Sequence, residues 1–220
     1  RGDVGDFTLP EWSNRYFLHK EREFTGKIKK VEEKLQNILK QKDLIKTSLF
    51  ELEQYKILFC GNGKALERQV TKVLEEMGFN VKVGTSNRVD LIVEFKGKIA
   101  VVEIKGTSKS AAENHSRQLE QWVSEYCIAN EISECKGILI INAFSNSPLD
   151  ERMSKKVFPD SMTKISVERR HCLITTTQLL GLFYAIQNSP GKRDELISEL
   201  FETVGIYPKF EDYHEFIEET

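Results

Sequence analysis

The 220-residue sequence lacks several patterns that define particular protein classes. Its four cysteines form no CxxC pair, and no histidine stands at zinc-finger spacing from them, so neither a disulfide framework nor a structural zinc site is indicated. No apolar run reaches the roughly 18 residues of a membrane-spanning helix, and no signal-peptide pattern opens the chain. We therefore expect a soluble, cytoplasmic protein with no membrane partner.

Charge is nearly balanced over the whole chain, with 32 basic and 34 acidic side chains, but it is unevenly distributed. From Asp194 to Thr220 nine acidic residues stand against the single lysine Lys209, which leaves the remainder of the chain net positive. Residues 15–46 contain ten basic and five acidic residues. This excess would attract a polyanion, although such runs are more often simply solvated helix faces.

The sequence predicts three segments: an N-terminal segment with a long helix over 1–54, a core domain over 55–190, and a C-terminal helix with an acidic tail over 191–220. The chain begins with Arg rather than Met. This suggests a fragment or a processed product and leaves room for a missing upstream domain.

Apolar residues recur in alternating steps of four and three along residues 20–54, which predicts one long helix. Lys42 occupies one position of this stripe, which otherwise consists of Phe24, Ile28, Val31, Leu35, Ile38, Ile45, Leu49 and Leu52. A stripe this narrow suits a coiled-coil homodimer through the helix Phe24 to Leu52. A helical hairpin and an amphipathic helix lying across its own domain fit the same pattern.

Residues 89–106 predict a β-hairpin, because two Val/Ile/Leu/Phe-rich arms flank the short tip Lys96-Gly97. A tip of two residues pairs Leu91 with Val102. Side chains alternate along a strand, so one face of the hairpin is fully apolar and is expected to be a core face. Its residues are Leu91, Val93, Phe95, Ala100, Val102 and Ile104.

The opposite face of the hairpin carries charge and is expected to be a site. The same register sets Asp90 opposite Glu103, with Lys105 beside Glu103 on that face. Like charges directly opposite in a sheet repel by about 0.2–1 kcal/mol, so the pair needs a cation. Lys105 and a divalent metal are the two candidates; a merely solvated strand end is the unremarkable alternative.

The flanking segments complete an alternating pattern of helices and strands. Before the hairpin, a helix over about 64–77 buries Leu66, Val70, Val73 and Met77, with Glu67 at the border of that stripe, and residues 79–83 form a strand. The turn Gly61-Asn62-Gly63 departs from the Walker pattern and predicts a plain turn.

After the hairpin, Ser110 and Glu113 form an expected capping box that opens a helix over 111–130. Its core face holds Leu119, Trp122, Val123 and Tyr126. Residues 136–144 predict a buried strand, and 145–170 a long polar connection. Further elements are expected over 171–175 (strand), 177–187 and 193–204 (helices).

Together, Glu67 in LERQV, Asp90 in RVDLIV, Glu103 and Lys105 in VVEIKG, and Gln118 in RQLEQW resemble the PD-(D/E)XK, or restriction-endonuclease-like, nuclease superfamily. An aspartate followed a dozen residues later by E-x-K is a weak signal alone. The carboxylate helix upstream, the hairpin register and the Q-x-x-x-W helix downstream make the combination much more specific. The residue before the aspartate is Val rather than Pro, a departure that many members of the family share.

The resemblance spans about residues 56–145 and implies an α/β fold, with a mixed central β-sheet flanked by helices, to which this chain adds a long N-terminal helical arm. It also implies metal-dependent hydrolysis of phosphodiester bonds. Asp90, Glu103 and the backbone carbonyl of Ile104 would hold Mg²⁺ or Mn²⁺, since hard cations prefer oxygen ligands.

The resemblance assigns the remaining residues as well. Lys105 would orient the attacking water and offset charge in the transition state. Glu67 would complete the metal shell or bind a second ion through water, and Gln118 would hydrogen-bond near the ligand Glu103 or the nucleic-acid backbone. His115 and Lys109 are weaker candidates for phosphate contact.

The expected function is therefore a metal-dependent endonuclease acting on DNA, with RNA retained as an alternative substrate. Two further alternatives belong to other classes: a catalytically inactive nuclease-like scaffold, and a nucleic-acid-binding module that assembles through its N-terminal helix. The intact Asp, Glu and Lys set argues against loss of activity. No base-reading element is identifiable, so sequence specificity is not derivable.

Overall fold

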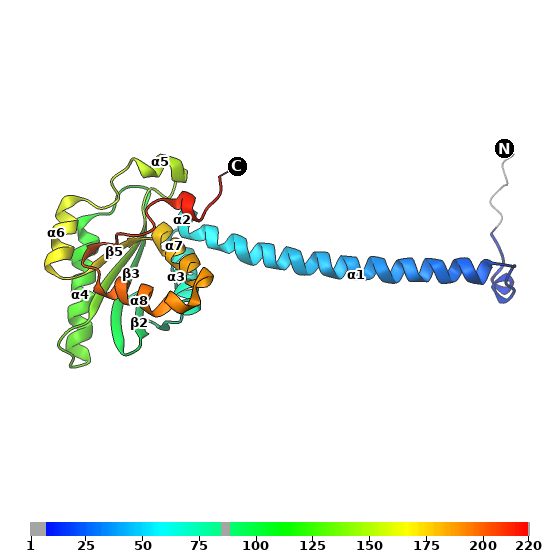
Figure 1. Ribbon diagram of the computed structural model, residues 1–220, viewed down its shortest axis with the longest axis horizontal. Helices are drawn as coiled ribbons and strands as arrows, with labels where there is room; N and C mark the ends of the chain where they lie inside the picture. Colours follow the sequence, from blue (N-terminus) through cyan, green and yellow to red (C-terminus); the bar gives the residue numbers. More distant parts are fainter. Residues whose placement is uncertain (1–7, 85–88, 220) are drawn as a thin grey trace. The chain divides into compact units, whose positions relative to one another are not determined.

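The computed structural model describes residues 8–84 and 89–219 and divides into two compact units, Arg1–Leu52 and Glu53–Thr220. Residues 1–7 and 220, which belong to the expected terminal segments, lie outside the described residues. The first unit contains a short 3-10 helix, Glu11–Arg15, and the 33-residue helix α1, Glu21–Glu53 (Figure 1). The long helix expected over residues 20–54 is confirmed.

The second unit consists of a β-sheet and the helices that flank it (Figure 1). Its helices are α2 (Ile57–Cys60), α3 (Gly63–Glu76), α4 (Glu113–Ala129), α5 (Leu149–Met153), α6 (Asp160–Glu168), α7 (Thr176–Asn188) and α8 (Arg193–Glu202). Its strands are β1 (Asn80–Val83), β2 (Leu91–Phe95), β3 (Lys98–Gly106), β4 (Lys136–Asn142), β5 (Cys172–Thr175) and β6 (Gly205–Ile206). Short 3-10 turns span Gln54–Lys56, Pro190–Lys192 and Tyr213–Glu215. The expected mixed α/β fold with a long N-terminal helix is confirmed.

The six strands lie in the sheet in the order in which they follow one another along the chain. β1, β2 and β3 are antiparallel neighbours, whereas β3, β4, β5 and β6 run parallel to one another. Parallel neighbours need a crossover connection, which α4 supplies between β3 and β4 and α6 between β4 and β5. The carboxyl ends of β3, β4 and β5 therefore lie at one edge of the sheet.

The β2–β3 hairpin has the predicted register. Leu91 pairs with Val102, and the connection is the two-residue turn Lys96-Gly97. Lys96 has φ = 49° and Gly97 φ = 80°, the two left-handed conformations of a type I′ turn, whose twist matches that of the flanking strands. The turn thus fixes which residues of β2 and β3 face each other.

Both faces of the sheet are core faces. The predicted apolar face of the hairpin packs under α2, α3, α7 and α8 in the larger core, which contains Leu66, Val93 and Leu182. The other face packs under α4 and α6 in a second core of Val101, Ala111, Leu119, Leu139, Ile141, Phe158, Met162 and Leu173. The charged face of the hairpin, expected to be a site, therefore also contributes to a core, because Val101 is buried there and Ile92 packs against the same core. Asp90, Glu103 and Lys105 stand at one end of this face, and the half-buried Glu94 lies toward the turn.

The long polar connection expected over residues 145–170 is wrong. The segment contains the helices α5 and α6, whose N-caps are Pro148 and Pro159. Phe158 and Met162 are buried in the second core, and this burial anchors the segment against the sheet. Because these two short helices need only a few apolar residues to anchor them, the composition of residues 145–170 is as polar as that of a loop.

The capping box expected at Ser110 is also wrong. α4 begins at Glu113 with Ala112 as its N-cap, and the backbone N–H of Ala112 donates to Nδ1 of His115 at 3.3 Å. Ala111 is instead held by a hydrogen bond to the carbonyl of Val157 and by burial in the second core. Tertiary contacts therefore delay the helix start by two residues.

The turn Gly61-Asn62-Gly63, between α2 and α3, packs on the carboxyl ends of β3 and β4. Asn142 Nδ2 donates to the carbonyl of Gly61 at 2.7 Å, and Gly106 approaches Asn62 so closely that a Cβ on Gly106 would lie 2.8 Å from the Asn62 Cα. Gly63, with φ = 50°, then turns the chain into α3. The first turns of α3 are thereby held beside the end of β3.

We predict that Gly106→Ala lowers the free energy of unfolding by about 1–3 kcal/mol, because the added methyl group overpacks against the Asn62 backbone. Gly191→Ala is the matched control, since a Cβ there meets nothing within 4 Å, and should change stability by less than about 0.5 kcal/mol. Denaturant unfolding of both variants checks the prediction. Equal stabilities would show that the close approach of the turn to β3 does not constrain the fold.

Candidate active site

The candidate site lies where β2 begins and β3 ends, on the face of the sheet that α4 covers. Asp90 directly precedes β2, one residue beyond the last pair of the hairpin ladder, Leu91 and Val102. Its Oδ2 accepts a hydrogen bond from the backbone N–H of Ile104 at 2.7 Å. This bond holds the half-buried carboxylate across the strand pair, against the segment of β3 that carries Glu103 and Lys105.

Glu103 is a buried carboxylate without adequate hydrogen bonding. Only 1% of its side chain is exposed, and within the described residues neither carboxylate oxygen has a hydrogen-bond partner of acceptable geometry. Lys105 Nζ lies 2.5 Å from Oε1, so the two form an ion pair by distance although the angle is poor for a hydrogen bond. A buried carboxylate normally accepts several hydrogen bonds. Glu103 therefore presents oxygen atoms with unused capacity to bind a cation.

The electrostatics of the site also favour a bound cation beside Glu103. Burial raises the pKa of Glu103 to about 7, the ion pair with Lys105 lowers it, and the negative charges of Asp90 and Glu67 raise it further. One lysine thus does not offset the burial and the two neighbouring carboxylates. A bound divalent cation would favour the charged form of Glu103, because nearby positive charge lowers a carboxyl pKa.

Glu67 reaches this cluster from the other side of the sheet. It is half-buried on α3, whose apolar residues pack in the larger core, and the turn before α3 holds the helix beside the end of β3. Its charge raises the pKa of Glu103. Asp90 and Lys105 thus lie beside Glu103, and Glu67 on α3 is close enough for its charge to act on Glu103.

The three remaining candidates lie around the site with different surroundings. His115, near the start of α4, is half-buried. Burial lowers its pKa, and the charge of the nearby Lys105 lowers it further. Its Nδ1 already accepts the hydrogen bond from Ala112. Gln118 is half-buried one turn before Trp122 on α4, whereas Lys109 is exposed in the loop between β3 and α4. In the described part of the chain, no hydrogen bond or ion pair joins Gln118 or Lys109 to Glu103.

The donor set fits a hard, hydrated cation better than a soft one. Among residues 8–84 and 89–219, no group of three or more His, Cys, Asp or Glu side chains is arranged to hold a metal ion. Two carboxylates and the carbonyl of Ile104 nevertheless make an all-oxygen set, and Mg²⁺ commonly uses one or two carboxylates and keeps several water molecules. With Glu103 buried and unsatisfied, these residues are compatible with Mg²⁺ or Mn²⁺.

Sequence reasoning overlooked Asn142 and Arg152, which support this end of the sheet. Besides its bond to Gly61, Asn142 accepts a hydrogen bond through Oδ1 from Arg152 Nη1 at 3.0 Å. Arg152 also donates to the carbonyls of Phe59 and Ser147, at 2.8 Å each. Asn142 ends the apolar run of β4. A polar residue at the carboxyl end of a buried strand was the sequence signal that could have predicted its role.

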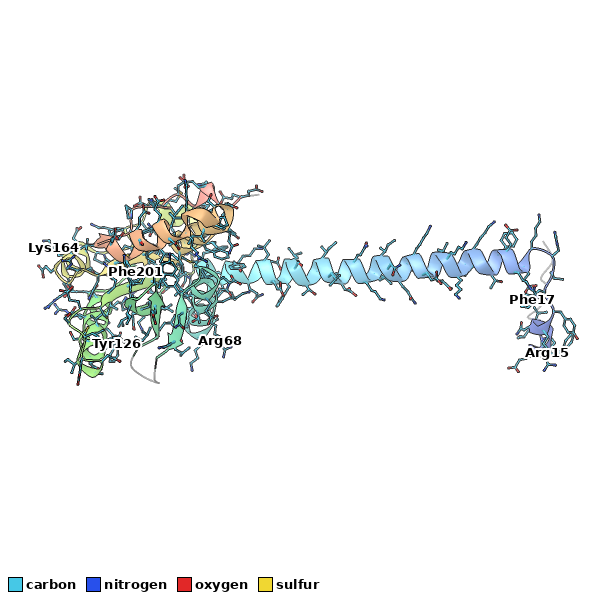
Figure 2. The ribbon with its side chains drawn as sticks, turned by 60° about the horizontal axis from the view of Figure 1, so that its bottom comes forward. Arg15, Phe17, Arg68, Tyr126, Lys164 and Phe201 are labelled. Carbon is cyan, nitrogen blue, oxygen red and sulfur yellow. The ribbon has the colours of Figure 1, made fainter. Side chains whose placement is uncertain are left out.

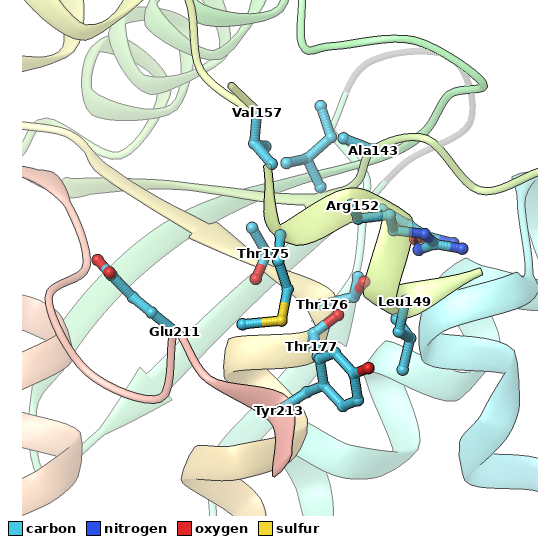
Figure 3. Close-up of a pocket in the computed structure, with 12 residues that line it drawn as sticks. Ala143, Leu149, Arg152, Val157, Thr175, Thr176, Thr177, Glu211 and Tyr213 are labelled. Atoms are coloured by element: carbon cyan, nitrogen blue, oxygen red, sulfur yellow. Dashed lines mark hydrogen bonds between the residues drawn. The ribbon is translucent and has the colours of Figure 1, made fainter. Parts of the chain in front are cut away.

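A cavity of about 100 Å³ lies at the same edge of the sheet, beyond the end of β4 (Figure 3). The end of β5 and the start of α7 line it with Thr175, Thr176 and Thr177, and Glu211 and Tyr213 close another side. Ile141, which pairs with Lys105 in the sheet, is also part of the wall. The cavity thus lies one strand away from the candidate site.

Among solved structures, the fold is similar to a chain described as the structure of restriction endonuclease FokI. The TM-score is 0.48 and the sequence identity 14%, over 66% of this chain and 28% of that chain. Models of protein families and curated proteins gave no match. The mixed sheet with flanking helices expected for this chain is established by its own strand order and register.

We predict that Asp90→Asn leaves the melting temperature in EDTA unchanged or raised. The asparagine oxygen can still accept the Ile104 N–H, while the loss of one charge relieves repulsion on Glu103. Mg²⁺ should raise the melting temperature of the wild type by stabilising the folded state, and should not raise that of the variant.

Differential scanning calorimetry with EDTA and with Mg²⁺ checks this, with Asp43→Asn on α1 as the control that should behave as the wild type. A variant destabilised in EDTA, beside a wild type indifferent to Mg²⁺ and Mn²⁺, would make Asp90 a structural partner and not a metal ligand.

Proposed function

We propose that this chain is a metal-dependent endonuclease domain that hydrolyses phosphodiester bonds, with DNA as its substrate. The observation that carries the proposal is the buried, poorly satisfied carboxylate of Glu103 between Asp90 and Lys105 at the end of β3. A buried acid whose pKa is strongly perturbed by burial and by specific neighbours is characteristic of functional sites. The sequence motifs that resemble the PD-(D/E)XK nucleases fall on these same residues.

Asp90, Glu103 and the carbonyl of Ile104 would hold Mg²⁺ or Mn²⁺. The ion, when bound, would polarise the scissile phosphate and lower the pKa of a coordinated water. Asp90 is suited to this role because its hydrogen bond with Ile104 fixes the carboxylate against β3 before any ligand arrives. Such prior ordering reduces the entropy lost on binding.

Lys105 would act on the substrate. Its side chain is 29% exposed, and its ammonium group contacts Glu103. Once a cation neutralises the carboxylates, Lys105 would be released to orient the attacking water and to offset the charge that grows on the phosphate. The ammonium group would thus pair with Glu103 before a cation binds and stabilise the transition state afterwards.

Four further residues would support the reaction. Glu67 would bind the metal shell through water or hold a second ion, and Gln118 would hydrogen-bond near Glu103 or the nucleic-acid backbone. His115, whose pKa is lowered by burial and by the charge of Lys105, and the exposed Lys109 would contact phosphates. The net positive charge of the chain outside its acidic C-terminal segment favours a polyanionic substrate.

A non-catalytic alternative is favoured by one observation: the described residues contain no arrangement of three metal-ligating side chains. On this alternative the fold is a scaffold or a nucleic-acid-binding module, and the Glu103–Lys105 pair is structural. Incubation with supercoiled DNA, linear DNA and RNA, each in Mg²⁺, Mn²⁺ and EDTA, separates the two. Metal-dependent cleavage supports the proposal, and binding without cleavage in either metal contradicts it.

We predict that Lys105→Ala lowers the rate of DNA cleavage by at least about 100-fold while changing the dissociation constant for DNA by less than about threefold. The physical reason is that Lys105 would stabilise charge that develops only in the transition state. Single-turnover cleavage and filter binding check the two quantities, with circular dichroism to establish that the variant is folded.

Lys82→Ala is the matched control, because Lys82 is an exposed lysine on β1 and should leave the cleavage rate unchanged. Cleavage at the wild-type rate by Lys105→Ala would remove Lys105 from the mechanism without affecting the assignment of Asp90 and Glu103.

A further inference from the structure

The helix α1 presents a continuous apolar stripe to solvent. Every residue of the helix is exposed, and Figure 2 shows its side chains standing out around the ribbon. The stripe consists of eight apolar residues whose exposed fractions lie between 54% and 69%: Phe24, Ile28, Val31, Leu35, Ile38, Ile45, Leu49 and Leu52. Monomeric proteins rarely leave so regular an apolar surface uncovered.

We propose that this stripe is the interface with a second copy of this chain, in a parallel two-stranded coiled coil. The proposal concerns the first unit alone and is independent of the nuclease activity proposed for the second. It selects one of the arrangements that the sequence pattern leaves open, and it rests on the heptad register of the helix, on the charges that flank the stripe and on the area available for burial.

The stripe has the spacing of a heptad seam along the whole helix. Alternating steps of four and three place Ile28, Leu35, Lys42 and Leu49 at the a positions and Phe24, Val31, Ile38, Ile45 and Leu52 at the d positions. A helix that packs against a globular domain usually shows a wider apolar face. The apolar residues of α1 instead concentrate at a and d, with only Leu39 (e), Leu44 (c) and Phe50 (b) outside the seam. This is the narrow seam of a coiled coil, sustained here for more than four heptads.

Lys42 is the polar residue of the seam and limits the number of strands. Leucine at a with isoleucine at d, as at Leu35 and Ile38, by itself favours three or four strands, whereas β-branched Ile28 at a favours two. In a four-stranded bundle, however, four Lys42 side chains would converge in a closed core. At the open edge of a two-stranded seam the long side chain can carry its ammonium group out to water. A single charged a position therefore favours two strands.

The flanking charges favour the parallel orientation. In a parallel coiled coil a g residue faces the following e residue of the other strand, which pairs Lys27 with Glu32 of the partner subunit, twice by symmetry. The other g and e positions that follow, such as Lys34 with Leu39 of the partner subunit, bring no like charges together. The antiparallel pairing of full overlap sets Lys27 against Ser48 and Lys34 against Gln41 and offers no opposite charges.

The stripe is large enough to hold two copies together. Burial of roughly 60–100 Å² for each of the eight apolar side chains would remove about 1,000–1,600 Å² from water over both copies, which reaches the size of specific protein interfaces. The 33 residues of α1 also form about nine turns, well beyond the length at which isolated helices are marginal. The chain thus carries a complete dimerisation segment.

A parallel pair of helices has a consequence for the second unit. Both helices end at Glu53, and the second unit follows directly in the chain, so both copies of that unit would be attached at the same end of the coiled coil. Each dimer would then carry two candidate sites, one in each copy of the second unit, whether or not either site is active. The dimer would therefore present paired sites to one ligand.

The test is the solution mass of the full chain by light scattering at micromolar concentration. We expect twice the chain mass of 25.4 kDa for the wild type and the single-chain mass for Val31→Glu with Ile38→Glu. The matched control, Gln36→Glu with Thr47→Glu, adds the same charge at the outer b and f positions of the heptads and should remain dimeric. A monomeric wild type would overturn the proposal, and so would a four-chain assembly.

A gain of affinity provides the second variant, which loss of folding cannot imitate. Lys42→Ile completes the apolar seam and should lower the dimer dissociation constant by about tenfold or more. Analytical sedimentation of the full chain over a dilution series measures this constant. An unchanged dissociation constant would place Lys42 outside the interface and contradict the heptad register. Neither measurement uses DNA or metal, so failure here is distinguishable from failure of the nuclease proposal.

Discussion

Side chains alternate between the two faces of a strand, and the two-residue turn Lys96-Gly97 fixes how β2 and β3 are aligned. A slip of one residue would carry Glu103 into the larger core and bring Ile104 to the site. The same slip would move Val102 and Ile104 out of that core, at a cost of several kcal/mol for two buried side chains. The register that the core demands is thus the one that sets the carboxylates together.

The remainder of the site depends on how the ends of the parallel strands are covered. Asn142 links the turn at Gly61 to Arg152, and the absent side chain of Gly106 lets that turn approach β3. These contacts hold α3, and with it Glu67, near Glu103, whose side chain lies on the opposite face of the sheet. The guanidinium of Arg152 donates to three backbone carbonyls and to Asn142, so it stabilises the scaffold and does not take part in the site.

Much of this arrangement was predictable because the signals were local. The spacing of apolar residues predicts α1 and α3, and a two-residue hairpin tip predicts the pairing of Leu91 with Val102. The prediction of a polar loop over residues 145–170 failed because the helices α5 and α6 depend on a few residues, such as Phe158 and Met162, that are buried in a core formed by distant segments. The two-residue strand β6 was missed for the same reason, since its existence depends on pairing with β5.

The candidate site shows where sequence reasoning ends. The pattern predicts that Asp90, Glu103 and Lys105 share one face, but it gives no measure of burial, and burial decides the chemistry. An exposed pair of carboxylates beside a lysine would be an ordinary surface cluster, worth little to stability. With Glu103 almost completely buried, the side chain must either take up a proton or find positive charge beyond that of Lys105. This requirement follows from the fold and not from any resemblance, and it makes the site's response to a divalent cation the property that separates an enzyme from a scaffold.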